Sequence, residues 1–292
     1  MPRRIIDAVA ITHPDRIVYP RSHITKAEVA SYYCAMAEHI LCDIAGRLLS
    51  VVRCPNGIDA AQFFQRHYVP GIGAHVHAVS IAEKSGHAAP YFYVADEHGL
   101  LELVQMDTIE LHGWGAQAAA PDLPDRVVFD LDPGPGIAWE SMVAAAALIR
   151  SHLLRAELQS FVRLTGGKGL HVVSPLERGP GWDEVGAFSG ALARTIASEH
   201  PEVYVATASK ARRAGRIFID WLRNARGATT IANWSLRARP GAPVAVPLRW
   251  EELQASQSGA DYDLYRARER AERLTIDPWE GFTGLRQKLP RY

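Results

Sequence analysis

The chain has 292 residues, 48% of them hydrophobic, so it can bury a sizeable core as one large domain or two closely packed lobes. Its 32 basic and 32 acidic side chains cancel, so net charge indicates no class of partner. Cys34, Cys42 and Cys54 form no C-x-x-C pair, which argues against structural zinc or a disulfide framework and favours the cytoplasm. No stretch approaches the roughly 18 apolar residues of a membrane span, and the N-terminus lacks an apolar signal region.

The first elements are predicted from local signals. Thr25 followed by Glu28 is a capping-box pattern, and the apolar spacing after it predicts one long amphipathic helix over 25–49. A strand is expected over 48–53, and a short helix or irregular segment over 60–67. The runs YFYVA and LLELVQM read as two strands joined by the turn-rich DEHG, which predicts a hairpin.

A boundary between lobes is expected at PDLPD, residues 121–125, and the pattern then alternates between strands and helices. The order β-α-β-β-α-β is the split βαβ arrangement of ferredoxin-like folds. In that arrangement the first and last strands are neighbours in the middle of the sheet. The expected elements are strand 127–132, helix 139–154, strands 161–165 and 170–176, helix 182–198 and strand 216–222.

Three acidic side chains lie within the apolar strands predicted here. Asp130 and Asp132 share one face of a strand, and Asp220 lies in the otherwise apolar run IFIDWL. Taken alone, the first two could be a strand-end pair before a Pro-Gly turn, and Asp220 could pair with a nearby arginine. Brought to one face by the predicted topology, the three carboxylates favour two oxygen-ligated divalent ions, Mn²⁺ or Mg²⁺, serving a phosphoryl transfer.

Phosphate-binding signals flank these acids. The glycine turn TGGKGLH, residues 165–171, can aim backbone N–H groups at an anion, with Lys168 adding a charge, although it is not a Walker A loop. A plain hairpin with a buried core His171 is the alternative. From residue 209 to 239 there are eight basic side chains against the single acid Asp220. This run indicates neutralisation of a nucleotide or backbone phosphate rather than only a solvated loop.

Two further groups stand in the N-terminal half. Phe63 and Phe64, with Arg53, could stack on an unpaired base, the alternative being core packing. His75 and His77 share a strand face as metal ligands would, but no third ligand is evident, so they are left unassigned.

Several motifs together resemble a known family. VVFDLDPG, TGGKGLHVV, RIFIDWLRNARGAT and RARPGAPVAVPLRWEEL are similar to the polymerase domain of bacterial ligase D, in the archaeo-eukaryotic primase superfamily. HPDRIVYP, TKAEVASYY, NGIDAAQFFQRH and LVQMDTIELHGWGAQ extend the resemblance over the N-terminal lobe. It implies an α+β fold in which a primase-type catalytic core, a split βαβ sheet of RRM or ferredoxin type over 121–292, packs on an N-terminal α/β lobe over 1–120. The two lobes are expected to form one compact unit.

The resemblance also implies roles for individual residues. Asp130, Asp132 and Asp220 would be the catalytic, metal-binding acids. Nucleotide binding would fall to Thr165, Gly166, Gly167, Lys168, His171, Arg213 and His112, and DNA binding to Arg16, Lys26, Arg53, Phe63 and Phe64, with Arg16 and Lys26 on a downstream 5′-phosphate. Three positions depart from the family pattern: Thr165 replaces a serine, Arg16 a lysine and His13 an asparagine.

The activity implied is that of a template-dependent nucleotidyltransferase that fills gaps and extends 3′ ends at double-strand breaks in non-homologous end joining. Proteins of this kind prefer Mn²⁺, often favour ribonucleotides over dNTPs, and work beside Ku and a DNA ligase, which implies a cytoplasmic, nucleoid-associated protein. Two alternatives remain. One is a DNA-end-bridging module with little catalysis, and the other is a glycosyltransferase using the D-x-D motif.

Overall fold

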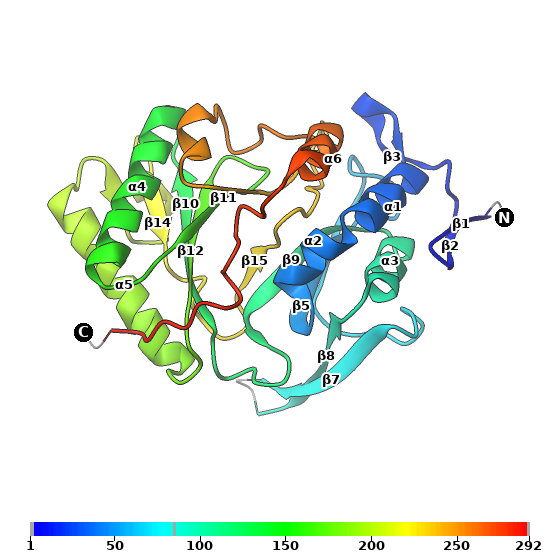
Figure 1. Cartoon of the computed structure of the whole chain (residues 1–292), viewed down its shortest axis with the longest axis horizontal. Coiled ribbons are helices and arrows are strands. Elements are labelled where there is room, and N and C mark those ends of the chain that lie inside the picture. The colour runs from blue at the N-terminus through cyan, green and yellow to red at the C-terminus, as the bar shows by residue number, and fades with distance from the viewer. Residues whose placement is uncertain (1–2, 84–85, 291–292) are drawn as a thin grey trace. The chain divides into compact units, whose positions relative to one another are not determined.

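The computed structural model describes residues 3–83 and 86–290 and contains two compact units (Figure 1). The first comprises 1–114, 231–245 and 262–274, and the second 115–230, 246–261 and 275–292. This division differs from the single boundary expected near residue 120, because two late segments return to the first unit. There the backbone N–H of Asn233 donates to Asp43 Oδ2 at 2.9 Å. That of Leu236 donates to the Tyr33 hydroxyl at 3.1 Å. Such long-range hydrogen bonds leave no local signal in the sequence.

The first unit combines short helices with small sheets. Its four-stranded sheet has the order β15-β9-β5-β6, and separate two-stranded sheets are formed by β1-β2, β3-β4 and β7-β8. The chain leaves this unit within β9 and returns to it within β15. The elements are β1 (Arg3–Ile6), β2 (Val9–Thr12), β3 (Ile17–Tyr19), the 3₁₀ turn η1 (Pro20–Ser22), β4 (Ile24–Thr25), α1 (Lys26–Ala35), α2 (Ala37–Ile44), β5 (Arg47–Arg53), β6 (Phe63–Gln65), β7 (Val76–Ala82), β8 (Ala88–Val94), α3 (Glu97–Gln105), β9 (Thr108–Gln117), β15 (Thr229–Ile231) and α6 (Leu264–Arg273).

The expected long helix over 25–49 is two helices, α1 and α2. The capping box is confirmed, since Thr25 accepts from the Glu28 N–H and the Glu28 side chain accepts from the Thr25 N–H. The break falls at Met36, whose backbone angles of φ −100° and ψ 3° leave the helical region. The last residues of the expected helix, from Arg47 on, belong instead to the predicted strand β5, which is confirmed.

Two other local predictions differ from the structure. Within 60–67, expected as a short helix or irregular segment, residues 63–65 form the strand β6, which pairs with β5, and the rest is irregular. The run LLELVQM lies in helix α3, because Asp96 caps that helix by accepting from the Gly99 N–H at 2.9 Å. Its buried residues include Leu100, Leu101, Leu103 and Val104, which is helical rather than alternating spacing. The hairpin in this region is β7-β8 instead.

The second unit is built on a six-stranded sheet of order β13-β14-β10-β12-β11-β16. The predicted β-α-β-β-α-β succession is confirmed, with the two-residue strand β13 added in the expected loop before β14, and β14 and β10 are neighbours in the sheet as expected. Helices α4 and α5 both pack on β10 (Figure 1). The elements are β10 (Arg126–Pro133), α4 (Trp139–Arg155), β11 (Phe161–Leu164), β12 (Leu170–Pro175), α5 (Trp182–Glu199), β13 (Tyr204–Val205), η2 (Lys210–Arg212), β14 (Ile217–Asp220), β16 (Val246–Leu248) and η3 (Glu252–Ala255). Among the described residues, no helix is both long and apolar enough to cross a membrane.

Candidate active site and nucleic-acid-binding residues

Three carboxylates meet on the central strands of the second unit. Asp130 of β10 is the register partner of Asp220 of β14, and Asp132 follows two residues later on the same strand face. One oxygen from each carboxylate lies within 4.8 Å of the others. Asp130 and Asp220 are buried, and Asp132 is partly buried. The predicted meeting of the three acids is therefore confirmed.

Two basic side chains contact this cluster. Arg223 Nε lies 3.1 Å from Asp130 Oδ2 and 3.3 Å from Asp220 Oδ2, so the arginine pairing considered for Asp220 is present within the cluster. His171, the register partner of Asp130 on β12, places Nε2 3.3 Å from Asp130 Oδ1. His171 is buried, as the core alternative expected, and it also contacts a site carboxylate.

Arg163 determines which nitrogen of His171 carries the proton. The fully buried Arg163 donates from Nε to His171 Nδ1 at 3.1 Å, so Nδ1 accepts and Nε2 holds the hydrogen that faces Asp130. Burial lowers the pKa of His171 and the Arg163 charge adds to this, although Asp130 opposes it, so that the pKa is about 4. The imidazole is therefore neutral near neutral pH, and it donates a hydrogen bond without adding charge.

The electrostatics of the cluster suit a bound cation. Burial raises the pKa of Asp130, but His171 and Arg223 outweigh it and lower the value to about 2. Burial and the Asp130 charge raise the pKa of Asp132 to about 6, and burial also raises that of Asp220. Arg223 supplies one positive charge to three carboxylates. This all-oxygen donor set fits a hard divalent ion such as Mg²⁺ or Mn²⁺.

Asn224, beyond the end of β14, holds the strand β10 that carries Asp130 and Asp132. Its buried side chain accepts from the Val128 N–H and donates to the Val128 carbonyl, both at 2.7 Å. The Asn224 amide thus pairs with the Val128 backbone as a neighbouring strand would, two residues before Asp130. The geometry of Asp130 depends on this contact because a buried backbone pair without partners is costly.

The glycine turn presses against the end of β10. The Thr165 hydroxyl donates to the Gly169 carbonyl at 3.0 Å and closes the turn, while Gly166 has φ of 65° and Lys168 is exposed. A Cβ on Gly169 would lie 2.3 Å from the Leu131 carbonyl oxygen, so only glycine permits this approach. The turn therefore packs against Leu131, the residue before Asp132.

Arg213 approaches the same end of β10 from the loop between β13 and β14. Its guanidinium carbon lies 3.8 Å from the centre of the Phe218 ring, and Nη2 donates to the Ala208 carbonyl at 3.0 Å. A Cβ on Gly134 would lie 2.0 Å from the Arg213 carbonyl oxygen, so glycine is required here too. The loop is thereby held beside the strand that carries Asp132.

In the first unit, two of the predicted DNA-binding cations share one acid. Arg16 pairs with Asp107, and Lys26 Nζ lies 2.8 Å from Asp107 Oδ1. Lys26 also donates to the Gln105 carbonyl at 2.6 Å and is only 3% exposed. Burial lowers the pKa of Lys26, and the charges of Arg16 and Arg53 add to this although Asp107 opposes it. An added anion would relieve this excess of positive charge.

Phe63 and Phe64 are 54% and 56% exposed, so core packing is wrong for both rings. They stand on β6, where Phe63 is the register partner of Arg53. Arg53 donates to the Met106 carbonyl at 2.6 Å and to Gln65 Oε1 at 2.8 Å, which orients its guanidinium.

His112, expected at the nucleotide site, lies in the first unit. Its Nε2 is 2.8 Å from Glu110 Oε2, and its ring centre is 6.2 Å from that of Phe64. Glu110 also pairs with Arg237 Nε at 3.1 Å. Burial would raise the pKa of Glu110, but His112 and Arg237 lower it to about 2.

Sequence reasoning missed the supporting residues Arg163, Asn224 and Asp107. Arg163 is a charge inside the apolar strand FVRLT, and this conflict with burial was an available signal. Asn224 and Asp107 gave no comparable signal because their partners lie far away in the chain.

Comparisons with known proteins agree with this geometry. Residues 25–279 match the family model described as LigD, primase-polymerase domain. The chain is 39% identical over 286 residues to the multifunctional non-homologous end joining protein LigD of Pseudomonas aeruginosa, which covers 96% of this chain and 34% of that protein. It is 32% identical over 249 residues to the protein of the same name from Mycolicibacterium smegmatis, covering 85% and 32%.

Among solved structures, the polymerase domain from Mycobacterium tuberculosis ligase D in complex with DNA matches with a TM-score of 0.88 at 29% identity. The match covers 94% of this chain and 98% of that one, and supports the α+β, primase-type fold. The chain spans about a third of the length of the curated relatives it matches. With a family model matched over 25–279 and a relative 39% identical, the chain belongs to the LigD primase-polymerase domain family.

Proposed function

We propose that this chain is a template-dependent nucleotidyltransferase that fills gaps and extends 3′ ends at DNA double-strand breaks. The observation that carries the proposal is the cluster of Asp130, Asp132 and Asp220, whose oxygens lie within 4.8 Å of one another on paired strands. A D-x-D glycosyltransferase would not need the third acid from a neighbouring strand.

The carboxylates of Asp130, Asp132 and Asp220 would hold two divalent ions. Bound there, such ions supply charge stabilisation for the attacking and leaving oxygens of phosphoryl transfer. His171, held neutral by burial and by Arg163, keeps Asp130 oriented through its Nε2 hydrogen. The glycine turn at 165–169 and exposed Lys168 would bind the triphosphate of the incoming nucleotide beside Asp132.

The first unit would bind the DNA end. Arg16 and Lys26, oriented by Asp107, suit a terminal 5′-phosphate, which accepts several charge-assisted hydrogen bonds. Exposed Phe63 and Phe64 would stack on unpaired bases of the template or overhang.

The biological setting is proposed from the relatives. Curated relatives are named non-homologous end joining proteins, and the similar solved domain is a complex with DNA. We therefore place this chain in end joining, beside Ku and a DNA ligase, at the nucleoid. Mn²⁺ as the preferred ion and ribonucleotides as the preferred substrates are part of the same proposal.

The test is extension of a labelled primer on a short-gapped duplex with a 5′-phosphate, in Mn²⁺ or Mg²⁺ and with NTPs or dNTPs. We expect templated addition by the wild type, more with NTPs and Mn²⁺, and none by Asp132→Ala. Untemplated addition, or equal addition by both proteins, would contradict the proposal.

A DNA-end-bridging module is the second candidate, favoured by the exposed Phe63 and Phe64. It predicts that Asp132→Ala joins two ends in a gel-shift assay as well as the wild type does, with no addition by either. Addition by the wild type would reject it as the main function.

A further inference from the structure

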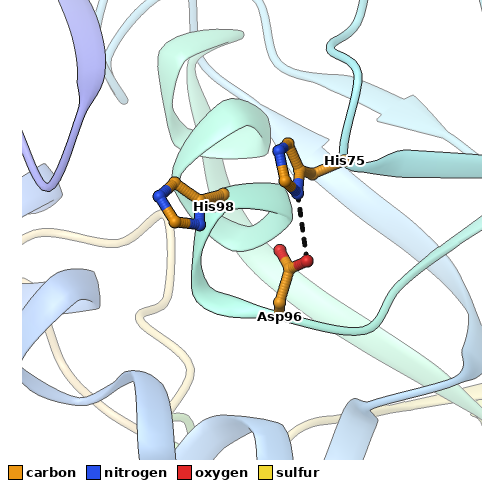
Figure 2. Close-up of side chains that lie close together, drawn as sticks. All are labelled: His75, Asp96 and His98. Atoms are coloured by element: carbon orange, nitrogen blue, oxygen red, sulfur yellow. Dashed lines mark hydrogen bonds and ion pairs between the residues drawn. The ribbon is translucent and has the colours of Figure 1, made fainter.

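A second group of metal-ligating side chains lies in the first unit. His75, Asp96 and His98 each offer one ligand atom, and these atoms lie within 4.8 Å of one another (Figure 2). His75 Nδ1 is 3.0 Å from Asp96 Oδ2, and the two imidazole centres are 5.0 Å apart. The pairing considered from sequence, His75 with His77, is absent from this group, because the His77 ring lies 5.1 Å from that of Tyr93 instead. The missing ligands are contributed by the start of α3.

Two glycines and a glutamate bring His75 to this position. The backbone N–H of His75 donates to Glu102 Oε2 at 2.7 Å, which ties the residue before β7 to helix α3. A Cβ on Gly73 would lie 2.2 Å from that same oxygen, and one on Gly99 would lie 2.5 Å from the His75 carbonyl oxygen. The close approach of His75 to the first turn of α3 therefore requires glycine at position 99, and a Cβ at position 73 would displace the Glu102 side chain.

The other two ligands are also oriented by the backbone and by neighbours. Asp96 uses Oδ1 to cap α3 at the Gly99 N–H, which leaves Oδ2 directed at His75. His98 turns one ring nitrogen toward Asp96 and His75 and the other away (Figure 2). Its Nε2 lies 3.8 Å from Asp7 Oδ2, on the β1-β2 turn. A carboxylate near the second nitrogen is the usual outer partner of a metal-bound histidine.

We propose that His75, Asp96 and His98 form a site for a borderline transition-metal ion of the Zn²⁺ type. Ligand bonds of about 2.0–2.2 Å place the ligand atoms of a tetrahedral ion roughly 3.3 Å apart, close to the observed 3.0 Å between His75 and Asp96. Imidazole nitrogens suit Zn²⁺ better than the Mg²⁺ or Mn²⁺ that an all-carboxylate site prefers. Solvent reaches the fourth position, since the three side chains are 42–46% exposed.

The ion would have a structural effect. It would join the residue that precedes β7 to the first turn of α3, and so hold the base of the β7-β8 hairpin against that helix. The three carboxylates of the second unit offer oxygen ligands alone, so the two sites differ in donor chemistry.

The experiment is calorimetric titration of Zn²⁺ into chelator-treated protein in an excess of Mg²⁺, which keeps the carboxylate cluster saturated. The wild type is expected to bind Zn²⁺ and to gain thermal stability from it. His75→Ala and His98→Ala should each lose roughly 10-fold or more in affinity, since loss of even an outer partner typically costs that much. Asp96→Asn should lose affinity while keeping the cap of α3, because asparagine also caps helices.

His77→Ala is the matched control, since it removes a neighbouring histidine of the same segment, and it should bind Zn²⁺ as the wild type does. All variants are checked for folding by circular dichroism before titration. Absence of Zn²⁺ binding in the wild type, or equal binding by the His75, His98 and His77 variants, would overturn the proposal.

Discussion

Asp130 and Asp220 are register partners on the antiparallel strands β10 and β14, so strand pairing sets the separation of the two carboxylates. A slip of one residue would turn either side chain to the opposite face of the sheet. Asp132 joins them through the two-residue repeat of its own strand. The acids are thus preorganised by backbone hydrogen bonds, and substitutions among them test charge rather than position.

Asp132→Asn should abolish nucleotide addition and yet stabilise the metal-free protein at about pH 7.5. The folded-state pKa of Asp132 is raised to about 6. The stability from its protonation is therefore present below about pH 4, the ordinary aspartate value, and is lost as the pH rises through 6. Removing the charge should raise the free energy of unfolding by on the order of 1–3 kcal/mol, measured by urea titration in EDTA. The control is Glu202→Gln at an exposed acid. An Asn variant less stable than the wild type would refute the repulsion argument.

His171→Gln should reduce the loss of unfolding free energy that the protein suffers as the pH is lowered. The folded-state pKa of His171 is lowered to about 4, so stability is lost as the pH falls from about 6.5 to 4. The wild type should lose up to about 3 kcal/mol of unfolding free energy across this window, and the variant clearly less. Urea titrations at several pH values measure this, with the exposed His200→Gln as control. Identical pH profiles for wild type and His171→Gln would show that His171 does not titrate in this way.

Lys26→Ala should erase the preference for a 5′-phosphorylated gap over a 5′-hydroxyl gap. A hydrogen bond to a charged group contributes about 1.5–3 kcal/mol, so the ratio of the two dissociation constants should fall by roughly 10-fold or more. Fluorescence anisotropy with the two duplexes measures the ratio. Arg21→Ala removes an exposed charge from the neighbouring turn and should leave the ratio unchanged. A phosphate preference retained by the Lys26 variant would remove this lysine from the site.

Phe64→Ala should weaken binding to DNA with a single-stranded overhang without destabilising the fold. The ring is 56% exposed, so its removal leaves little cavity. Stacking on one base contributes about 1–3 kcal/mol, so the dissociation constant should rise at least roughly 5-fold, with blunt duplex binding changed less. Ile5→Ala removes a 74% exposed apolar side chain elsewhere in the same unit and serves as the control. Equal losses on blunt and overhang DNA would argue against base stacking.

Asn224→Ala should lower the free energy of unfolding by about 2–4 kcal/mol, because it leaves the buried N–H and carbonyl of Val128 without their amide partner. Urea unfolding measures the change. Leu222→Ala, at a 42% exposed position of the same segment, should cost far less. Equal stability of the Asn224 variant and the wild type would show that the strand end does not depend on this side chain.

The sequence by itself determined the succession of elements in the second unit. Period-two apolar runs and intervening helical spacing are local properties, so the β-α-β-β-α-β order, the neighbouring strands β10 and β14 and the meeting of Asp130 with Asp220 could all be predicted. The capping box at Thr25 could be predicted for the same reason, since both partners lie within one helical turn.

Tertiary structure decided what depends on distant partners. LLELVQM is apolar enough for a strand or a helix, and its packing favours helix α3; the Asp96 cap lies within one helical turn and was a local signal for the helix. Burial keeps His171 neutral, and Arg163 from another strand determines which of its ring nitrogens holds the hydrogen. The side chains near His75 are Asp96 and His98, at the start of α3, rather than His77. Local periodicity fixes which face of an element is buried, whereas hydrogen bonds and charges between elements depend on positions that no short window of sequence contains.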